Sequence, residues 1–284
     1  MIKPGELYVV PTPIGNLGDM SPRAVSVLQA VDLILAEDTR HSAPLLRHFQ
    51  ITTPCKSFHE HNEKQLANSV CEQILDGQSM ALISDAGTPL ISDPGFPLVR
   101  LAHEQGIKVI SIPGPCAAIA AVAASGLAVD RFSFEGFLPH KSEARKKVLG
   151  ELVREPRTLI FYESPHRIQA TVDDMTTVFG AERKVVLARE ISKLFETILH
   201  TDLGSLAEIV SNDADQRKGE IVLVVEGVAD SGETASDIET ETLMRELLTE
   251  LPLKKAVGLA VKITGGKKNA LYQLALKLQE QNTE

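Results

Sequence analysis

The sequence has few cysteines and no apolar run approaching the length of a membrane span. Its three cysteines, Cys55, Cys71 and Cys116, have no CxxC spacing and form an odd set, which argues against a disulfide framework or a zinc site. The N-terminus also lacks the basic-then-apolar pattern of a secretory signal. These absences predict a cytoplasmic protein with no membrane contact and no metal.

Several common catalytic motifs are missing as well. The chain has no GxGxxG fingerprint, no GxxxxGK[ST] loop, no GxSxG elbow and no HExxH helix. The commonest dinucleotide, phosphate-binding, acyl-transfer and metalloprotease sites are therefore excluded.

The order of apolar segments predicts an α/β protein. At 284 residues the chain is long enough for two compact domains. Strands alternate with helices over the first part, and closely spaced strands after Gly126 indicate antiparallel pairing. We predict a mostly parallel sheet in residues 1–120, a mixed sheet in 121–228, an acidic linker at 229–240 and a small helix-turn-helix-like tail at 241–284.

The most informative segment is SDAGTPLISDPG, residues 84–95, which follows the apolar run 80–83. A strand, a stiff loop of small residues and a helix form a ligand site outside the carboxyl end of an α/β sheet. PTPIGNLGD after 7–10 and PGPCAA after 108–112 share this design. Because parallel strands point their carboxyl ends the same way, we expect the three loops to converge on one ligand.

These loops are rich in backbone amides and poor in lysine and arginine, which suits adenosine carrying an amino acid better than ATP. Asp85 is a candidate acceptor for a ribose hydroxyl or an ammonium group. Gly87 allows close backbone approach, and Thr88 is a candidate donor to a carboxylate. The alternative is that the segment is only a rigid turn.

Charged residues directly follow two predicted strands. The second predicted strand, residues 32–36, is followed by Glu37, Asp38 and Arg40. Paired acids at this place would position or deprotonate a substrate hydroxyl. A structural ion pair between Asp38 and Arg40 explains the pattern equally well. Glu190 follows another apolar strand and carries the same two alternatives, a catalytic group or half of a salt bridge.

The net charge of −9 is unevenly distributed. Residues 226–250 carry eight acids and one base, whereas two other regions are basic. Such clusters are either solvated helix faces or contacts to a phosphate backbone. The candidate nucleic-acid contacts are Lys141, Arg145, Lys146 and Lys147 on one helix, and Lys254, Lys255, Lys267 and Lys268 in the tail.

Together, VPTPIGNLGD, AEDTR, FHEHNE, SDAGTPLISDPG, PGPCAA, FYESPHR and ARE resemble the tetrapyrrole-methylase-like superfamily of S-adenosylmethionine enzymes. Within it, they are most similar to the bacterial 16S ribosomal RNA (cytidine 2′-O) methyltransferases, over essentially the whole chain. Tetrapyrrole enzymes usually carry GxGxGD where this chain has PIGNLGD, and that departure speaks against a corrin or porphyrin substrate.

The resemblance implies two α/β domains, a homodimer and S-adenosylmethionine held in a cleft. Carried over position by position, the cofactor contacts are Pro13, Gly15, Leu17, Asp85, Thr88, Cys116, Ala117, Tyr162, Ala188 and Glu220. The expected reaction is methylation of a cytidine 2′-oxygen in the decoding region of 16S rRNA within the small ribosomal subunit. The alternatives are a tetrapyrrole or precorrin methyltransferase and a non-catalytic RNA-binding protein.

Overall fold

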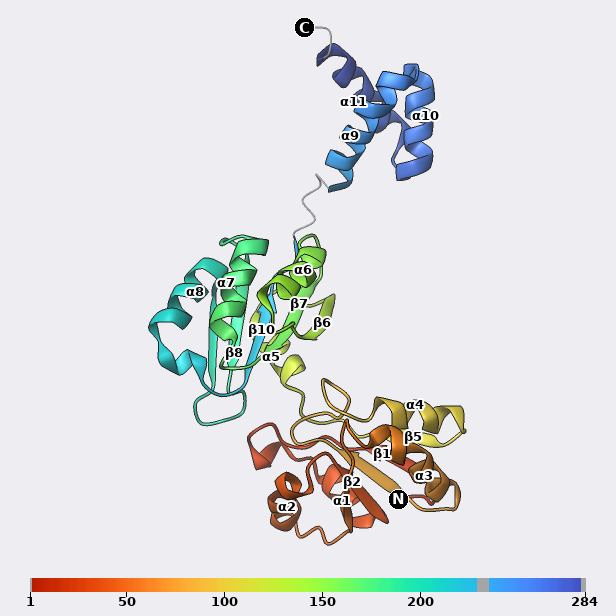
Figure 1. Ribbon diagram of the computed structural model, residues 1–284, viewed down its shortest axis with the longest axis vertical. Helices are drawn as coiled ribbons and strands as arrows, with labels where there is room; N and C mark the ends of the chain where they lie inside the picture. Colours follow the sequence, from red (N-terminus) through yellow and green to blue (C-terminus); the bar gives the residue numbers. More distant parts are fainter. Residues whose placement is uncertain (1, 229–234, 282–284) are drawn as a thin grey trace. The chain divides into compact units, whose positions relative to one another are not determined.

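The computed structural model (Figure 1) describes residues 2–228 and 235–281. The chain divides into two compact units. The larger unit contains residues up to 226 except Arg154–Pro156, which belong with the C-terminal helices in the smaller unit. Each unit has its own hydrophobic core.

The first sheet of the larger unit is parallel throughout its described strands. Its strands are β1 (Glu6–Val9), β2 (Leu33–Ala36), β3 (Cys55–Ser57), β4 (Met80–Ile83) and β5 (Lys108–Ser111), in the order β3-β2-β4-β1-β5. The helices between them are α1 (Pro22–Ala30), α2 (Thr39–His48), α3 (Glu63–Leu75) and α4 (Phe96–Glu104). Sequence reasoning missed β3, because three residues reading Cys-Lys-Ser are too short to show an apolar pattern.

Both faces of this sheet are covered, so its strands are apolar without alternation. Tyr8 belongs to the cluster packed with α1, whereas the adjacent Leu7 belongs to the cluster packed with α3 and α4. Helix α1 begins with the Ser21 hydroxyl accepting a hydrogen bond from the Ala24 amide at 3.1 Å and with Pro22 in the first helical position.

The second sheet is mixed, as predicted. Its strands are β6 (Phe132–Phe137), β7 (Thr158–Glu163), β8 (Lys184–Arg189), β9 (Thr197–Asp202) and β10 (Ile221–Val225), in the order β6-β7-β10-β8-β9. Only β6 and β7 pair in parallel among the described strands of this sheet; the other neighbours are antiparallel. The accompanying helices are α5 (Ala117–Ser125), α6 (Ser142–Leu152), α7 (Ile168–Phe179) and α8 (Leu203–Asn212).

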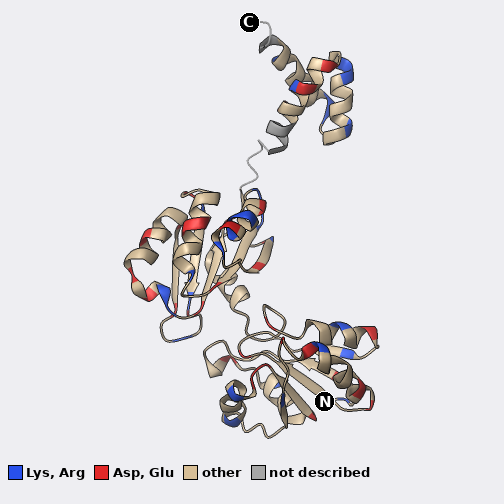
Figure 2. Ribbon diagram, in the orientation of Figure 1, with Lys and Arg blue, Asp and Glu red and all other residues tan. Residues whose placement is uncertain are grey.

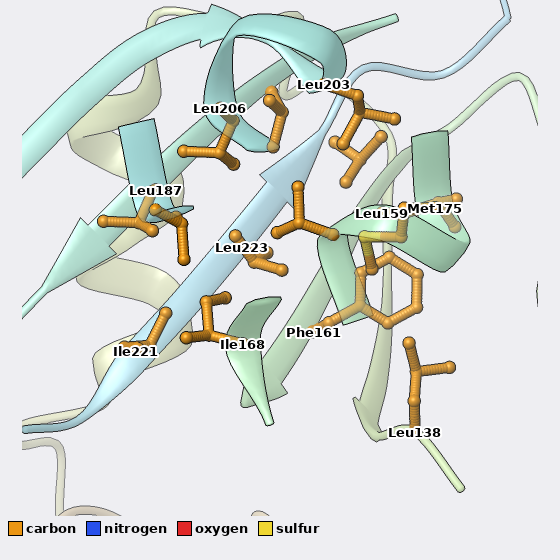
Figure 3. Close-up of a cluster of buried hydrophobic side chains, with 14 of the residues drawn as sticks. Leu138, Leu159, Phe161, Ile168, Met175, Leu187, Leu203, Leu206, Ile221 and Leu223 are labelled. Atoms are coloured by element: carbon orange, nitrogen blue, oxygen red, sulfur yellow. The ribbon is translucent and has the colours of Figure 1, made fainter. Parts of the chain in front are cut away.

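The two faces of the second sheet have different cores. On one face, Phe161 and Leu223 pack with Met175 of α7 and Leu206 of α8 (Figure 3). On the other face, α5 buries Ala118, Ala121 and Val122. The predicted boundary at residue 120 therefore cuts through a helix that packs on the second sheet. Ile119 of the same helix is 52% exposed.

The smaller unit contains three helices in its described part: α9 (Ala235–Glu250), α10 (Leu253–Thr264) and α11 (Lys268–Gln281). Residues 229–234 of the predicted linker lie outside the described residues. The rest of that linker is helical, so the tail begins at Ala235 instead of 241. Gly265 ends α10 in the left-handed conformation, at φ 70°, where the sequence predicts a turn between two helices. None of the helices described here is long and apolar enough to cross a membrane.

Candidate methyl-donor site

The three predicted loops meet at one edge of the first sheet. They follow β1, β4 and β5, which are neighbours in the order β4-β1-β5. The amide of Thr12 donates to the Gly87 carbonyl at 2.9 Å, and the amide of Gly87 donates to the Thr12 carbonyl at 3.1 Å. The Thr88 hydroxyl donates to the Pro115 carbonyl at 2.8 Å. The three loops therefore lie together, and their convergence on one ligand stays a prediction.

A cavity of about 320 Å³ lies beside these loops, within the size range of small-molecule sites. The ends of β6 and β7, the segments directly after β7 and β8, and residues 219–222 at the start of β10 close its other side. The lining residues are Ile14, Ala86, Gly87, Thr88, Ile91, Ser92, Asp93, Cys116, Ala117, Phe137, Tyr162, Glu163, Ser164, Pro165, Ile191, Gly219, Glu220, Ile221 and Val222.

Backbone strain shapes the wall of this cavity in two places. Leu90 and Ser92 have φ of 73° and 67°, and Glu190 and Ser192 have φ of 54° and 68°. These left-handed conformations cost about 1–3 kcal/mol each in a residue other than glycine. Each pair flanks an isoleucine, Ile91 or Ile191, that lines the cavity. The strain is therefore concentrated at the candidate site.

The charged side chains among the described lining residues are all acidic. Among the described residues, the wall contains three carboxylates and no lysine, arginine or histidine. Two of the carboxylates have cationic partners: Glu163 lies 3.3 Å from the Arg167 guanidinium, and Glu220 lies 3.2 Å from the Lys193 ammonium. The third, Asp93, has no ion pair in the described part of the chain. Burial, with the nearby Glu37 and Asp85 carboxylates, raises the pKa of Asp93 to about 7.

Tyr162 has fixed neighbours in the cavity wall. Its hydroxyl accepts a hydrogen bond from the Ala118 amide at 3.2 Å, at the first turn of α5. Phe137 packs edge-on against the Tyr162 ring, with ring centroids 5.6 Å apart. Burial, together with the neighbouring Cys116, raises the pKa of the phenol, so the hydroxyl stays protonated at neutral pH.

The structure places the predicted cofactor residues in two groups. Gly87, Thr88, Cys116, Ala117, Tyr162 and Glu220 line the cavity, whereas Pro13, Gly15, Leu17, Asp85 and Ala188 are not among its lining residues.

The residues of the second group have other surroundings. Ala188 is fully buried in the core beneath α5. A Cβ at Gly15 would lie 2.3 Å from the Lys193 side chain, so this position serves close packing. The Asp85 carboxylate accepts a hydrogen bond from the Asp38 amide at 3.1 Å. From the loop after β1, Ile14 lines the cavity instead.

Of the four candidate catalytic residues, Asp38 and Arg40 form the structural ion pair that the sequence left open as an alternative. Their side chains form an ion pair at 2.7 Å, and Asp38 also caps α2 by accepting the Arg40 amide at 2.8 Å. The hydrogen bonds from Arg40 hold the pKa of Asp38 well below its usual value. A carboxylate that stays ionised and paired is a poor proton acceptor.

Glu190 also has fixed partners. Its carboxylate accepts the Lys193 ammonium at 2.7 Å and the Glu220 amide at 2.9 Å. Burial acts in the opposite direction, but these contacts hold the pKa of Glu190 below its usual value. Glu190 is absent from the cavity lining and holds the loop 190–196 in place.

Glu37 remains a candidate for proton chemistry. Burial and the Asp85 carboxylate raise its pKa, against a hydrogen bond from the Asp85 amide at 3.4 Å. Asp93, which faces this group, was missed as a candidate because the segment 84–95 contains two aspartates. The sequence offered no signal to show which of them faces the cavity.

The predicted nucleic-acid contacts need one correction. Arg145 is buried, and its guanidinium pairs with the buried Asp174 at 2.6 Å and donates to the His140 carbonyl at 3.2 Å. It therefore cannot reach a phosphate. The remaining candidates are exposed and lie in α6, α10 and α11 or directly before them, and Figure 2 shows basic residues along these helices. They are Lys141, Lys146, Lys147, Lys254, Lys255, Lys267 and Lys268.

Comparisons with known proteins agree with this geometry. The family model described as Tetrapyrrole (Corrin/Porphyrin) Methylases matches residues 6–207. The chain belongs to the tetrapyrrole methylase family. A second model, the RsmI C-terminal HTH domain, matches residues 234–279, so both units of this family member have counterparts.

Curated relatives match almost the whole chain. One is the "Ribosomal RNA small subunit methyltransferase I" of Escherichia coli O157:H7, 54% identical over 97% of this chain and 96% of its own length. The protein of the same name from Pseudomonas aeruginosa is 54% identical over 97% and 98%.

Solved structures share the fold at low identity. A diphthine synthase has a TM-score of 0.61 at 14% identity, with 78% of this chain and 89% of that chain covered. A uroporphyrin-III C-methyltransferase from Thermus thermophilus, complexed with S-adenosylhomocysteine, has a TM-score of 0.53 at 15% identity, covering 78% and 97%. These structures support the architecture alone.

Proposed function

We propose that this protein is an S-adenosylmethionine-dependent methyltransferase that methylates the ribose 2′-oxygen of a cytidine in the decoding region of 16S rRNA. The observation that carries the proposal is the cavity formed by the three stiff loops, with carboxylates and no basic side chain on its described wall. The names of the 54%-identical relatives supply the substrate class, small-subunit ribosomal RNA.

The cavity fits the proposed methyl donor by size and by charge. S-adenosylmethionine carries a positive sulfonium and an ammonium, which carboxylates stabilise and basic residues would repel. A nucleoside triphosphate would place several negative charges against Asp93 and Glu220. The apolar lining from Ile14, Ile91 and Ile191 suits the adenine ring. Bound there, the donor supplies an activated methyl group and leaves as a neutral thioether, so the chemistry requires no metal.

The protein's contribution is orientation and proton removal. The Thr88 hydroxyl is already hydrogen-bonded to the Pro115 carbonyl. We therefore assign its side chain to holding the loop and its backbone to binding the donor. The cavity wall excludes water from the reacting centre, and holding the ribose oxygen in line with the methyl group supplies a large part of the acceleration. A carboxylate then takes the hydroxyl proton.

The RNA is held, in this proposal, by exposed lysines of α6 and of the smaller unit, and the target cytidine is unpaired when it enters the site. We further propose that the protein acts in the cytoplasm as a homodimer and recognises 16S rRNA within the small subunit.

The deciding experiment has two parts. Calorimetric titration should show saturable binding of S-adenosylmethionine and none of ATP. Labelled donor incubated with small ribosomal subunits, or with precorrin-type substrates, should place its label on a cytidine 2′-oxygen of 16S rRNA. Label on a precorrin would identify a tetrapyrrole methyltransferase, and absence of donor binding would identify a non-catalytic RNA-binding protein.

The lysines of the smaller unit give a separate prediction. Replacing four exposed lysines by glutamine should weaken 16S rRNA binding and make it less salt-dependent, by about one unit of log–log slope for each phosphate that no longer meets a lysine. Donor affinity should not change. The four residues are Lys254, Lys255, Lys267 and Lys268. Filter binding across a salt series measures both quantities.

A control with the same change in charge comes from exposed lysines of the larger unit, Lys3, Lys56, Lys64 and Lys218. Replaced by glutamine, they should leave the salt slope nearly unchanged. Equal slopes for the two quadruple variants would show that the charge of the smaller unit makes no specific contribution.

A further inference from the structure

Asp93 differs from every other carboxylate on the described wall of the cavity. Glu163 is paired with Arg167 and accepts a hydrogen bond from the Ser164 amide at 2.7 Å. Glu220 has the Lys193 ammonium. Asp93 lines the same cavity without a cation among the described residues, and its side-chain hydrogen bond comes from Ser84. Among the described residues, therefore, no cation competes with a proton for the Asp93 carboxylate.

The loop holds Asp93 in a defined place. Ser92, directly before it, has φ 67°, and Gly95, two residues after it, has φ 123°. A Cβ at Gly95 would lie 2.5 Å from Leu82, so only glycine fits there. The buried Glu63 carboxylate accepts the Gly95 amide at 2.7 Å. This much strain and bonding fixes the loop, as a positioned functional group requires.

The groups facing Asp93 come from three elements. Glu37 follows β2, Asp85 follows β4, and Tyr162 belongs to β7. The two carboxylates repel a negative charge on Asp93, and the Tyr162 phenol stays neutral. A carboxylate among like charges and partly shielded from water gains a proton more readily than an ordinary aspartate.

We propose that Asp93 is the group that accepts the proton of the ribose 2′-hydroxyl during methyl transfer. This inference rests on the proposed function. The 2′-oxygen forms a bond to the methyl carbon, and the bond from that carbon to the donor sulfur breaks, its electron pair staying on sulfur. The O–H bond breaks with its proton passing to the Asp93 carboxylate, which later releases it to solvent.

The test compares the wild type with Asp93→Asn, using small ribosomal subunits and saturating S-adenosylmethionine. In the wild type, kcat should rise with pH and level off above a pH of about 7, because Asp93 must be ionised to act. Asp93→Asn should lose about 100-fold or more in kcat and should lose that inflection, a larger change than the loss in its affinity for the donor. Asp93→Glu should restore part of the rate together with the inflection.

A stability measurement separates this role from misfolding. The pKa of Asp93 is raised on folding, so ionising it opposes folding, and stability is lost as pH rises from the unfolded value toward about 7. Asp93→Asn should therefore raise Tm at pH 8 relative to the wild type. Asp76→Asn, an exposed aspartate at the end of α3, should change neither kcat nor the pH profile.

The outcomes distinguish the inference from the function on which it rests. A wild type that methylates no 2′-oxygen of 16S rRNA would overturn the proposed function and this role with it. An active wild type whose Asp93→Asn variant keeps kcat within threefold, or loses only donor affinity, would overturn the role of Asp93 alone.

Discussion

Replacing Arg145 by methionine is expected to lower the free energy of unfolding by about 3–5 kcal/mol. The Arg145 and Asp174 side chains are 3% and 9% exposed, and their charged atoms lie 2.6 Å apart. Removing the guanidinium leaves the Asp174 carboxylate buried, with the partly exposed Lys146 at 3.2 Å and the Ser142 hydroxyl at 3.0 Å as its remaining contacts. The His140 carbonyl loses the donor that Arg145 supplies, and the Pro139 carbonyl keeps the Arg167 guanidinium at 3.4 Å. Urea unfolding followed by circular dichroism measures the change.

Two further variants make this prediction specific. Lys147→Met, at an exposed position of the same helix, should change the free energy of unfolding by less than about 0.5 kcal/mol. Arg145→Met combined with Asp174→Leu should recover much of the lost stability, because both buried charges are then gone. If Arg145→Met instead keeps full stability and weakens only rRNA binding, Arg145 is an RNA contact after all.

Arg145 also shows where sequence reasoning reaches its limit. Lys141, Arg145, Lys146 and Lys147 look alike in a basic helix, and the sequence predicts one charged face. The residue that turns inward is decided by Asp174, which is 29 residues away and approaches through the packing of α7. No local pattern reports such a partner.

The sequence predicted the position of the cavity more accurately than the residues that line it. Apolar strands followed by glycine- and proline-rich loops fix the carboxyl edge of the first sheet, and Gly87 and Thr88 lie there as expected. Ala188 was carried over from the family resemblance, but its side chain is in the core. Asp85 and Asp93 share one loop with left-handed turns at Leu90 and Ser92 between them, and Asp93 alone of the two lines the cavity. Backbone strain of this kind has no signature in residue type.

The second large effect is expected at Gly87. Its φ is 80°, a conformation in which a β-branched residue is a genuine outlier. An added Cβ would lie 3.2 Å from Ile14 Cγ2 and 3.6 Å from the Pro115 carbonyl oxygen, so a larger side chain would press on two of the three converging loops. Gly87→Val should therefore weaken S-adenosylmethionine binding by about 100-fold or more, as measured by calorimetry.

Gly150→Val is the matched control, because Gly150 lies in α6 with nothing within 4 Å of the added Cβ. It should bind the donor within about twofold of the wild type. Two backbone hydrogen bonds between Thr12 and Gly87 join the loop after β1 to the loop after β4. A shift of Gly87 in Gly87→Val would break this link, whereas Gly150→Val leaves it intact. Donor affinity within threefold of the wild type in Gly87→Val would mean that donor binding does not depend on the meeting of these loops, and the methyl-donor site would then have to lie outside this cavity.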